Sequence, residues 1–193
     1  MPRTKQFDEK EVLNKAMELF WERGFHATSM QDLVTHLGIN RASLYDTFGS
    51  KDALFEQAFA LYRSTGRQML HRFFVEKHPV KDNFKKLLDV AIDEAINDPA
   101  KKGCFVVNVT TEMVPGNDRL HQVLLENKHY VETFFREQIQ KGIAKGEIGN
   151  HVNPNSTAEA IFTFYSGLRV VAKVEPDVEK LQKMVRVVLS ILD

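Results

Sequence analysis

Apolar residues recur along much of the chain with the period of a helix. Between residues 8 and 23 they fall three or four positions apart, at Val12, Leu13, Ala16, Leu19 and Phe20. Such spacing places apolar side chains on one face of an α-helix. The same period returns further along, in residues 83–97, 118–144, 155–173 and 177–192. The pattern predicts an all-α protein.

Residues 103–114 are the ambiguous segment. The stretch CFVVNVTT is rich in β-branched residues, which favour strands by propensity. Because every neighbouring segment has helical periodicity, we expect a helix here too. The prolines that follow Pro2 fall at positions 79, 99, 115, 154 and 176. Since proline breaks a helix interior, these positions mark the connections between helices.

Capping residues divide the N-terminal part into short helices. Asp8 with Glu11, and Thr28 with Gln31, form capping-box patterns at two helix starts. Asn40 and Ser50 are placed to cap the third and fourth helices, and the helix ends are expected at Gly24, Gly38 and Gly49. The fourth helix is long. A glycine inside it, Gly66, costs about 1 kcal/mol relative to alanine and indicates a bend.

Two short helices joined by LGIN predict a helix-turn-helix. In this motif the second helix enters the major groove of DNA. The stretch INRASLYDTFGSKDALF, residues 39–55, fits that task, because Leu44 and Phe48 would point inward and leave polar side chains exposed. The helix starts at Thr28 and Ser50 offer free N–H groups that can receive a phosphate.

The segment FHATSMQDLVTHLGINRASLYDTFGSKDALF resembles the DNA-binding motif of the TetR family of transcriptional regulators. The match runs from Gly24 to Phe55, and length and helical content fit along the whole chain. The resemblance implies an all-α homodimer on a palindromic operator in double-stranded DNA, with ligand-relieved repression. We expect a three-helix DNA-binding domain in residues 1–50, a connecting helix in 51–80, and a larger ligand-binding and dimerisation domain in 81–193.

The resemblance also implies roles for single residues. Thr28, Tyr45 and Lys51 match positions that contact phosphates in the family. Arg41, Ala42 and Ser43 match the variable positions that approach the bases. Arg41 is the best candidate for a paired contact with guanine, worth roughly 1–3 kcal/mol of discrimination. Asp46 differs from the residues expected to contact DNA, because it places a negative charge on the exposed face.

Composition indicates the kind of compartment in which the protein works. The chain has 193 residues, 43% of them hydrophobic, with a formal net charge of zero. A single cysteine excludes an intramolecular disulfide and fits a reducing compartment. The polar N-terminus is not a signal peptide, and no apolar run reaches the roughly 18 residues of a membrane span. We expect a soluble, cytoplasmic protein without a membrane partner.

Charge in the N-terminal part is unusual for a DNA-binding protein. Residues 1–60 contain seven Lys or Arg and nine Asp or Glu, a net charge of −2. Because non-specific binding to DNA depends on positive charge, we expect it to be weak. Arg3 and Lys5 on an N-terminal arm would add positive charge to the contact with DNA, with the minor groove as their place of binding.

The C-terminal part carries candidates for a ligand site. An apolar pocket for an unidentified small-molecule effector could be lined by Cys104, Phe105, Asn108, Phe134, Phe135 and Tyr165, with Asn108 as a polar anchor. The alternative is that these aromatic residues are ordinary core. Cys104 follows DPAKKG, where a helix N-terminus and two lysines would favour the reactive thiolate of a sensor. The alternative is a buried cysteine that packs as a small hydrophobe.

Residues 155–173 and 177–192 are expected to pair with their copies in a four-helix dimer interface. Gly167 lies within the apolar face and would permit close approach; the alternative is that both helices complete the intramolecular core. The histidines show no metal spacing, and no cofactor is expected. No nucleophile–base pair or phosphate loop supports an enzyme with a vestigial DNA-binding motif. A regulator without a small-molecule effector stays open as an alternative.

Overall fold

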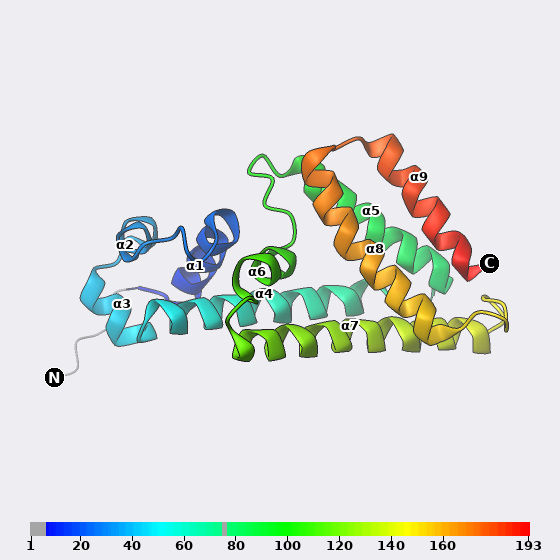
Figure 1. The fold of residues 1–193 in the computed structure, drawn as a ribbon, viewed down its shortest axis with the longest axis horizontal. Helices are drawn as coiled ribbons and strands as arrows, with labels where there is room; N and C mark the ends of the chain where they lie inside the picture. Colours follow the sequence, from blue (N-terminus) through cyan, green and yellow to red (C-terminus); the bar gives the residue numbers. More distant parts are fainter. Residues whose placement is uncertain (1–6, 75–76) are drawn as a thin grey trace. The chain divides into compact units, whose positions relative to one another are not determined.

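The computed structural model describes residues 7–74 and 77–193, and Figure 1 shows the order of the helices along the chain. Within these residues the chain forms nine α-helices and one short 3-10 helix, without a strand. The all-α prediction is therefore confirmed for the described part. The chain divides into two compact units, the first ending at Thr65 and the second beginning at Gly66. Arg3 and Lys5 lie outside the described residues.

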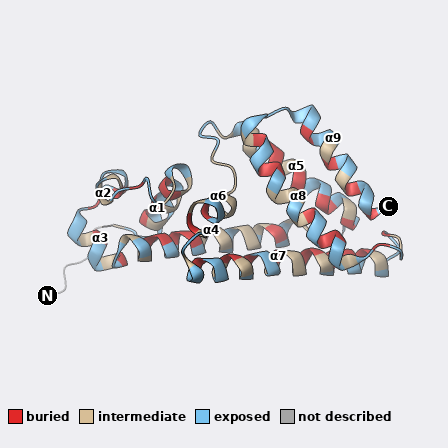
Figure 2. Cartoon of the chain, in the orientation of Figure 1, coloured by how far each residue is buried: buried red, intermediate tan, exposed pale blue. Residues whose placement is uncertain are grey.

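The first unit contains α1 (Glu9–Arg23), α2 (Met30–Leu37), α3 (Arg41–Phe48) and the N-terminal part of α4 (Lys51–Phe73). The buried positions, red in Figure 2, recur at helical spacing, as at Val12, Ala16, Leu19 and Phe20 of α1. Rings join α1 to α4: Phe20 and Phe55 meet edge to face at 5.3 Å between centroids. This apolar centre supports α2 and α3.

Most predicted helix ends of the first unit are confirmed. The Asp8 carboxylate accepts hydrogen bonds from the N–H groups of Lys10 and Glu11 at the start of α1. Asn40 Oδ1 accepts from Ser43 N–H at 2.8 Å, and Ser50 Oγ accepts from Ala53 N–H at 3.0 Å. These caps satisfy first-turn N–H groups that lack a partner within the helix, two of them at Asp8 and one each at Asn40 and Ser50.

The predicted cap of α2 was wrong by one residue. Ser29, not Thr28, is the cap: Ser29 Oγ accepts from Asp32 N–H at 3.1 Å, and Asp32 Oδ2 accepts from Ser29 N–H at 2.9 Å. The side chain of Thr28 is buried, and its hydroxyl donates to the carbonyl oxygen of Gly24 at 2.6 Å. Because Thr28 is buried and its hydroxyl is bonded to Gly24, Ser29 is the cap, and its partner Asp32 supplies a carboxylate, a stronger acceptor than an amide.

The second unit is a bundle around α5 (Val80–Asn97). This helix packs against α7 (Asp118–Ala144), α8 (Pro154–Val174) and α9 (Val178–Leu189), and α7 also packs against α6 (Phe105–Met113). A short 3-10 helix, Ser190–Leu192, follows α9. One apolar cluster joins α5, α7, α8 and α9, with Phe84, Leu88, Phe135, Ile161 and Val185 among its buried members.

The ambiguous β-branched segment is helix α6, as expected. Phe105, Val109 and Met113 recur every four residues and are buried. The hydroxyls of Thr110 and Thr111 donate back to the carbonyls of the preceding turn, at 2.7 and 3.2 Å. Burial of one face and these local bonds therefore outweigh the strand propensity of the segment.

Candidate nucleic-acid interface

The connection between α2 and α3 is a tight turn. Gly38 ends α2 in the left-handed conformation, with φ of 68°, and its N–H donates to Val34 O at 3.1 Å. Ile39 is buried beneath the turn, and Asn40 starts α3 immediately afterwards. Only glycine adopts this backbone region without strain, so the Gly38 turn brings the two helices together as a helix-turn-helix.

Helix α3 has an inner and an outer side. Leu44 and Phe48 are buried, four residues apart, and hold the helix to the first unit. Four of the outward-facing residues form a surface that we name the α3 face, Arg41, Ala42, Ser43 and Tyr45, and the exposed Asp46 lies next to it. Ser43 is half-buried and the other three are exposed, Tyr45 to 40%. The predicted base-reading residues are thus brought together on one surface.

Arg41 and Tyr45 lie one turn apart on this face and touch each other. The guanidinium carbon of Arg41 lies 5.7 Å from the centre of the Tyr45 ring. A cation over an aromatic face at this distance is attracted to it, although weakly at an exposed site. The contact aligns two long side chains that would otherwise move separately, and leaves their polar ends outward.

Lys51 occupies the first position of α4. Its ammonium lies 4.2 Å from the centre of the Phe25 ring, so the aliphatic stem is half-buried while the charge stays at the helix start. The N-terminus of a helix carries partial positive charge and is an unfavourable place for a lysine. An anion bound there would interact favourably with the lysine and with the first-turn N–H groups together.

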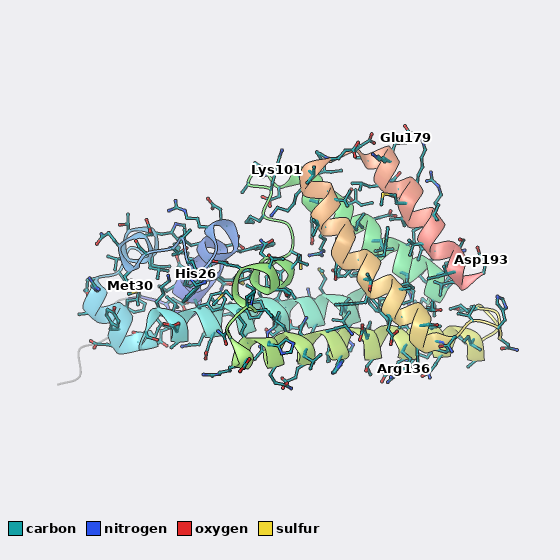
Figure 3. The ribbon with its side chains drawn as sticks, in the orientation of Figure 1. His26, Met30, Lys101, Arg136, Glu179 and Asp193 are labelled. Carbon is teal, nitrogen blue, oxygen red and sulfur yellow. The ribbon has the colours of Figure 1, made fainter. Side chains whose placement is uncertain are left out.

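Thr28 differs from the other predicted phosphate contacts. Its side chain is 0% exposed, and its hydroxyl already donates to Gly24. The exposed polar group at the start of α2 is the Ser29 cap, followed by Met30, which Figure 3 labels. The hydrogen bonds from the Ser29 side chain and backbone lower the pKa of the Asp32 carboxyl, with Arg23 at 3.6 Å contributing.

The model of bacterial regulatory proteins of the tetR family matches residues 12–58, which include the helix-turn-helix. A second model, tetracyclin repressor-like C-terminal domain, matches residues 81–188. The chain belongs to the TetR family. It is a DNA-binding transcriptional regulator, and regulators of this family act as dimers.

Relatives of this TetR-family regulator match over nearly its full length. The uncharacterized HTH-type transcriptional regulator YezE of Bacillus subtilis is 32% identical over 195 residues, covering all of both chains. The HTH-type transcriptional repressor ComR of Escherichia coli is 29% identical, covering 94% of this chain and 87% of ComR. A cysteine mutant of the TetR family regulator CifR, solved with 26-bp operator DNA, has a TM-score of 0.86, 28% identity, and covers 99% and 100% of the two chains.

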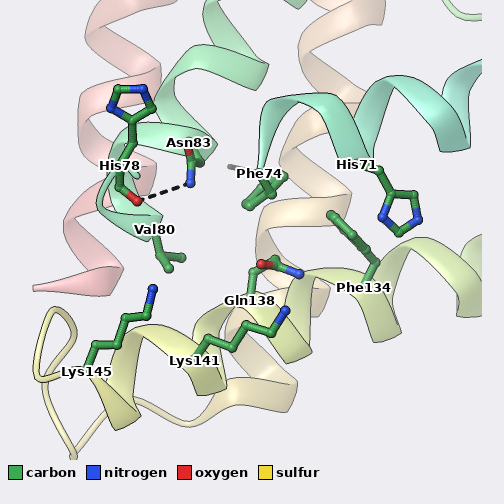
Figure 4. Close-up of a pocket in the computed structure, with 9 residues that line it drawn as sticks. All are labelled: His71, Phe74, His78, Val80, Asn83, Phe134, Gln138, Lys141 and Lys145. Atoms are coloured by element: carbon green, nitrogen blue, oxygen red, sulfur yellow. Dashed lines mark hydrogen bonds between the residues drawn. The ribbon is translucent and has the colours of Figure 1, made fainter. Parts of the chain in front are cut away.

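The residues predicted to bind a ligand in this TetR-family regulator occupy different surroundings in the second unit. Phe105 and Phe135 are fully buried and pack as core, and Asn108 donates to the Lys102 carbonyl at 2.8 Å, which fixes the loop before α6. Cys104 is the half-exposed N-cap residue of α6. Of the predicted set, Phe134 alone lines the pocket of Figure 4.

Tyr165 belongs to a polar group beside α6. Its hydroxyl accepts from Arg169 Nη2 at 2.7 Å, and the same guanidinium nitrogen lies 3.3 Å from Glu94 Oε2. Burial raises the pKa of the Tyr165 phenol, although the positive charge of Arg169 opposes the shift. Cys104 is a smaller cause of the same raised pKa, which places it near the Tyr165–Arg169 pair.

The pocket of Figure 4 was not predicted from the sequence. It has a volume of about 130 Å³, and its lining comes from the end of α4, the start of α5 and the second half of α7: His71, Phe74, His78, Val80, Asn83, Phe134, Gln138, Lys141 and Lys145.

In the described ranges no group of three or more His, Cys, Asp or Glu could hold a metal. None of the helices there is long and apolar enough to cross a membrane.

Proposed function

We propose that this regulator is a repressor that binds a palindromic operator as a homodimer and leaves it when an effector acts on the second unit. The α3 face carries this proposal: an exposed arginine–tyrosine pair on the second helix of a helix-turn-helix, flanked by the capped starts of α2 and α4. Its relatives include named repressors, and CifR was solved with its operator. Such a protein would work in the cytoplasm, where bacterial DNA is.

Each residue of the α3 face has a separate role in the proposal. Arg41 would pair with guanine in the major groove, while Ala42 and Ser43 approach neighbouring bases. Tyr45 and Lys51 would contact phosphates and set the register. Thr28 would act indirectly, because its buried hydroxyl ties Gly24 to the start of α2. The N–H groups beside the Ser29 cap take the phosphate contact in its place.

The dimer interface is proposed at α8 and α9. The exposed large apolar residues of the second unit gather on these two helices and the 3-10 helix, at Val170, Val171, Val174, Val178, Val187 and Ile191. Val174 is 83% exposed and Val187 is 71% exposed. Several large apolar side chains exposed on two neighbouring helices indicate a contact surface, and a two-fold axis would bury them against their copies.

Release would be a shift between two arrangements of the dimer. Residues 1–50 would bind DNA, residues 51–80 would transmit movement through α4, and residues 81–193 would bind the effector and dimerise. In the bound state the two α3 helices sit one DNA turn, about 34–36 Å, apart. To empty the operator, the effector must favour the released state by several kcal/mol.

Modification of Cys104 is the second route to release. An electrophile such as an α,β-unsaturated carbonyl would take Sγ at its β-carbon and the thiol proton at its α-carbon. The adduct would crowd the start of α6, where Gly103 already packs against the side chain of Lys173. It would also lie beside Tyr165 and its bond to Arg169.

The test combines operator selection with release. An operator is selected from random duplexes, and its complex with the full chain is titrated with a mild electrophile, an oxidant and candidate ligands, while intact-protein mass is followed. Release of wild type with a single adduct, and none from Cys104→Ser, would assign sensing to the thiol. Release of both proteins would assign it to a non-covalent ligand. Failure to select any operator would refute the proposed function.

A further inference from the structure

The pocket of Figure 4 lies wholly within the second unit and has an apolar wall. Phe74, from the residues that follow α4, and Phe134, on α7, meet edge to face at 5.2 Å, and Val80 adds a third apolar side chain. The His71 ring packs against Phe134 at 4.8 Å, and its Nε2 is hydrogen-bonded to the Tyr130 hydroxyl at 2.9 Å. Two aromatic rings and a valine suit a flat apolar ligand.

Gln138 is the polar residue at the centre of this lining. It is only 8% exposed, and its amide is directed into the pocket beside Phe74 and Lys141 (Figure 4). Gln138 is not among the described side chains that have a fully enclosed polar atom without a partner, so its amide keeps access to the pocket. A ligand or water in the pocket can therefore complete its hydrogen bonds.

Lys141 and Lys145 give the pocket its charge. They lie one turn apart near the end of α7 and both line the cavity. Within the described residues, neither ammonium forms an ion pair. The Glu147 carboxylate, close by in sequence, accepts instead from Val80 N–H at 2.8 Å. Like charges one turn apart on a helix repel, and an anion between them removes that repulsion.

The remaining polar groups do not oppose an anion. The side-chain amide of Asn83 donates to the carbonyl of His78 at 3.4 Å. The imidazole of His78 points away from the two lysines in Figure 4. The described lining therefore contains no carboxylate. Its titratable residues are two histidines and two lysines.

We propose that this pocket is the effector site and takes a small aromatic carboxylate. The ring would lie against Phe74 and Phe134, and the carboxylate would meet the Gln138 amide and the ammonium groups of Lys141 and Lys145. The cavity of about 130 Å³ is close in volume to an apolar cavity of roughly 150 Å³ that binds benzene, which limits the ligand to a single ring. The inference rests on the proposed function for its regulatory consequence, but the binding itself does not depend on DNA.

The position of the pocket suits regulation through α4. Phe74 follows the last residue of α4, and His71 in its last turn is tied to α7 through Tyr130. The guanidinium of Arg67, one turn earlier, stacks on the same tyrosine ring at 4.2 Å. A ligand pressed against Phe74 and Phe134 would alter this α4–α7 contact.

The test is calorimetric titration of the full dimer with benzoate, without DNA. We expect saturable binding with a Kd on the order of 0.1–1 mM, as for a ligand of this size. Benzyl alcohol, which keeps the ring but lacks the charge, should bind at least about tenfold more weakly. Inorganic phosphate, an anion without a ring, should not compete at the same concentration. 4-Hydroxybenzoate and phenylacetate extend the probes within the same class.

Variants identify the groups involved. Gln138→Met keeps the size of the side chain and should weaken benzoate about tenfold, because a hydrogen bond to a charged group is lost. Lys141→Gln combined with Lys145→Gln should weaken it by a similar factor and reduce its salt dependence. Gln140→Met makes the same change at an exposed position of α7, and Lys128→Gln removes one lysine charge from the exposed side of that helix; both should bind benzoate as wild type does.

Each outcome decides the proposal. Saturable benzoate binding that the pocket variants weaken, together with operator release by benzoate, supports it. No saturation by any of the three carboxylates up to about 10 mM overturns it, as does equal binding of phosphate or unchanged affinity in the pocket variants. Binding without operator release overturns the assignment as effector site. A chain that binds no operator refutes the proposed function, while the calorimetry still decides the pocket.

Discussion

At the scale of residues, a reciprocal pair of hydrogen bonds fixes the start of α2. The side chain of Ser29 accepts a hydrogen bond from Asp32 N–H, and the side chain of Asp32 accepts one from Ser29 N–H. The sequence TSMQD contains this pattern in two registers, and periodicity alone does not separate them. The choice depends on the burial of Thr28 and on its bond to Gly24, which only the folded chain provides.

Removing the cap should weaken the first unit. Ser29→Ala deletes the acceptor for Asp32 N–H, and loss of such a cap costs about 1 kcal/mol. Urea unfolding of the full chain measures the change. Ser43→Ala, which removes a hydroxyl from α3 but leaves the Asn40 cap intact, serves as the control. Equal stability of wild type and Ser29→Ala would show that the hydrogen bonds of this cap are dispensable.

The same pair predicts a dependence on pH. The folded-state pKa of Asp32 lies below its ordinary 3.8, so its contribution to stability is fully present above that value. The contribution is lost as pH falls through the folded pKa. The difference in stability between wild type and Ser29→Ala should therefore be constant near neutral pH and shrink below about pH 4. Unfolding curves at several pH values test this, and a difference that grows in acid would contradict it.

At the scale of elements, helices α1, α5, α7, α8 and α9 follow the apolar period of the sequence closely. Even the β-branched α6 is helical, because Phe105, Val109 and Met113 share one buried face. The period reveals which side of a helix is buried, but not what buries it. Periodicity alone therefore could not separate a ligand-lining role of Phe105 and Phe135 from ordinary core packing, and both side chains are fully buried.

Replacing glycine with alanine should raise the stability of the protein in a helix and lower it in a loop. A Cβ at Gly66, inside α4, would meet no atom within 4 Å, so Gly66→Ala should stabilise the protein by about 1 kcal/mol. At Gly103, where φ is 68°, a Cβ would lie 2.6 Å from Lys173 Cδ, so Gly103→Ala should destabilise it. Thermal unfolding of both variants gives the comparison. A loss of stability in Gly66→Ala would show that α4 needs the freedom of glycine at that point.

At the scale of the whole molecule, the sequence predicted the family fold and the DNA-binding surface but not the pocket. The motif residues of the α3 face lie within a few positions of one another, so local pattern places them together. The pocket instead joins His71, Val80 and Lys145, which come from three separate helices or their ends. Such long-range contacts leave no period in a single sequence.

The proposed dimer surface can be tested with one charge. Val187 on α9 is 71% exposed, and Val187→Glu would place a carboxylate in the apolar contact between copies. We expect the variant to sediment as a monomer at concentrations where wild type is a dimer, and to lose most of its operator affinity. Gln140→Glu on α7 adds the same charge elsewhere and should remain dimeric. A dimeric Val187→Glu would place the interface on another surface.

The most direct test of the account is operator reading by Arg41. Fluorescence anisotropy would compare wild type, Arg41→Ala and Lys51→Gln on the selected operator and on its single base-pair variants. We predict that Arg41→Ala loses about 10- to 100-fold in affinity and no longer distinguishes guanine at one position of each half-site. Lys51→Gln should bind all sequences more weakly and with a shallower salt dependence. Unchanged sequence preference in Arg41→Ala would contradict the assignment of the α3 face as the surface that reads DNA.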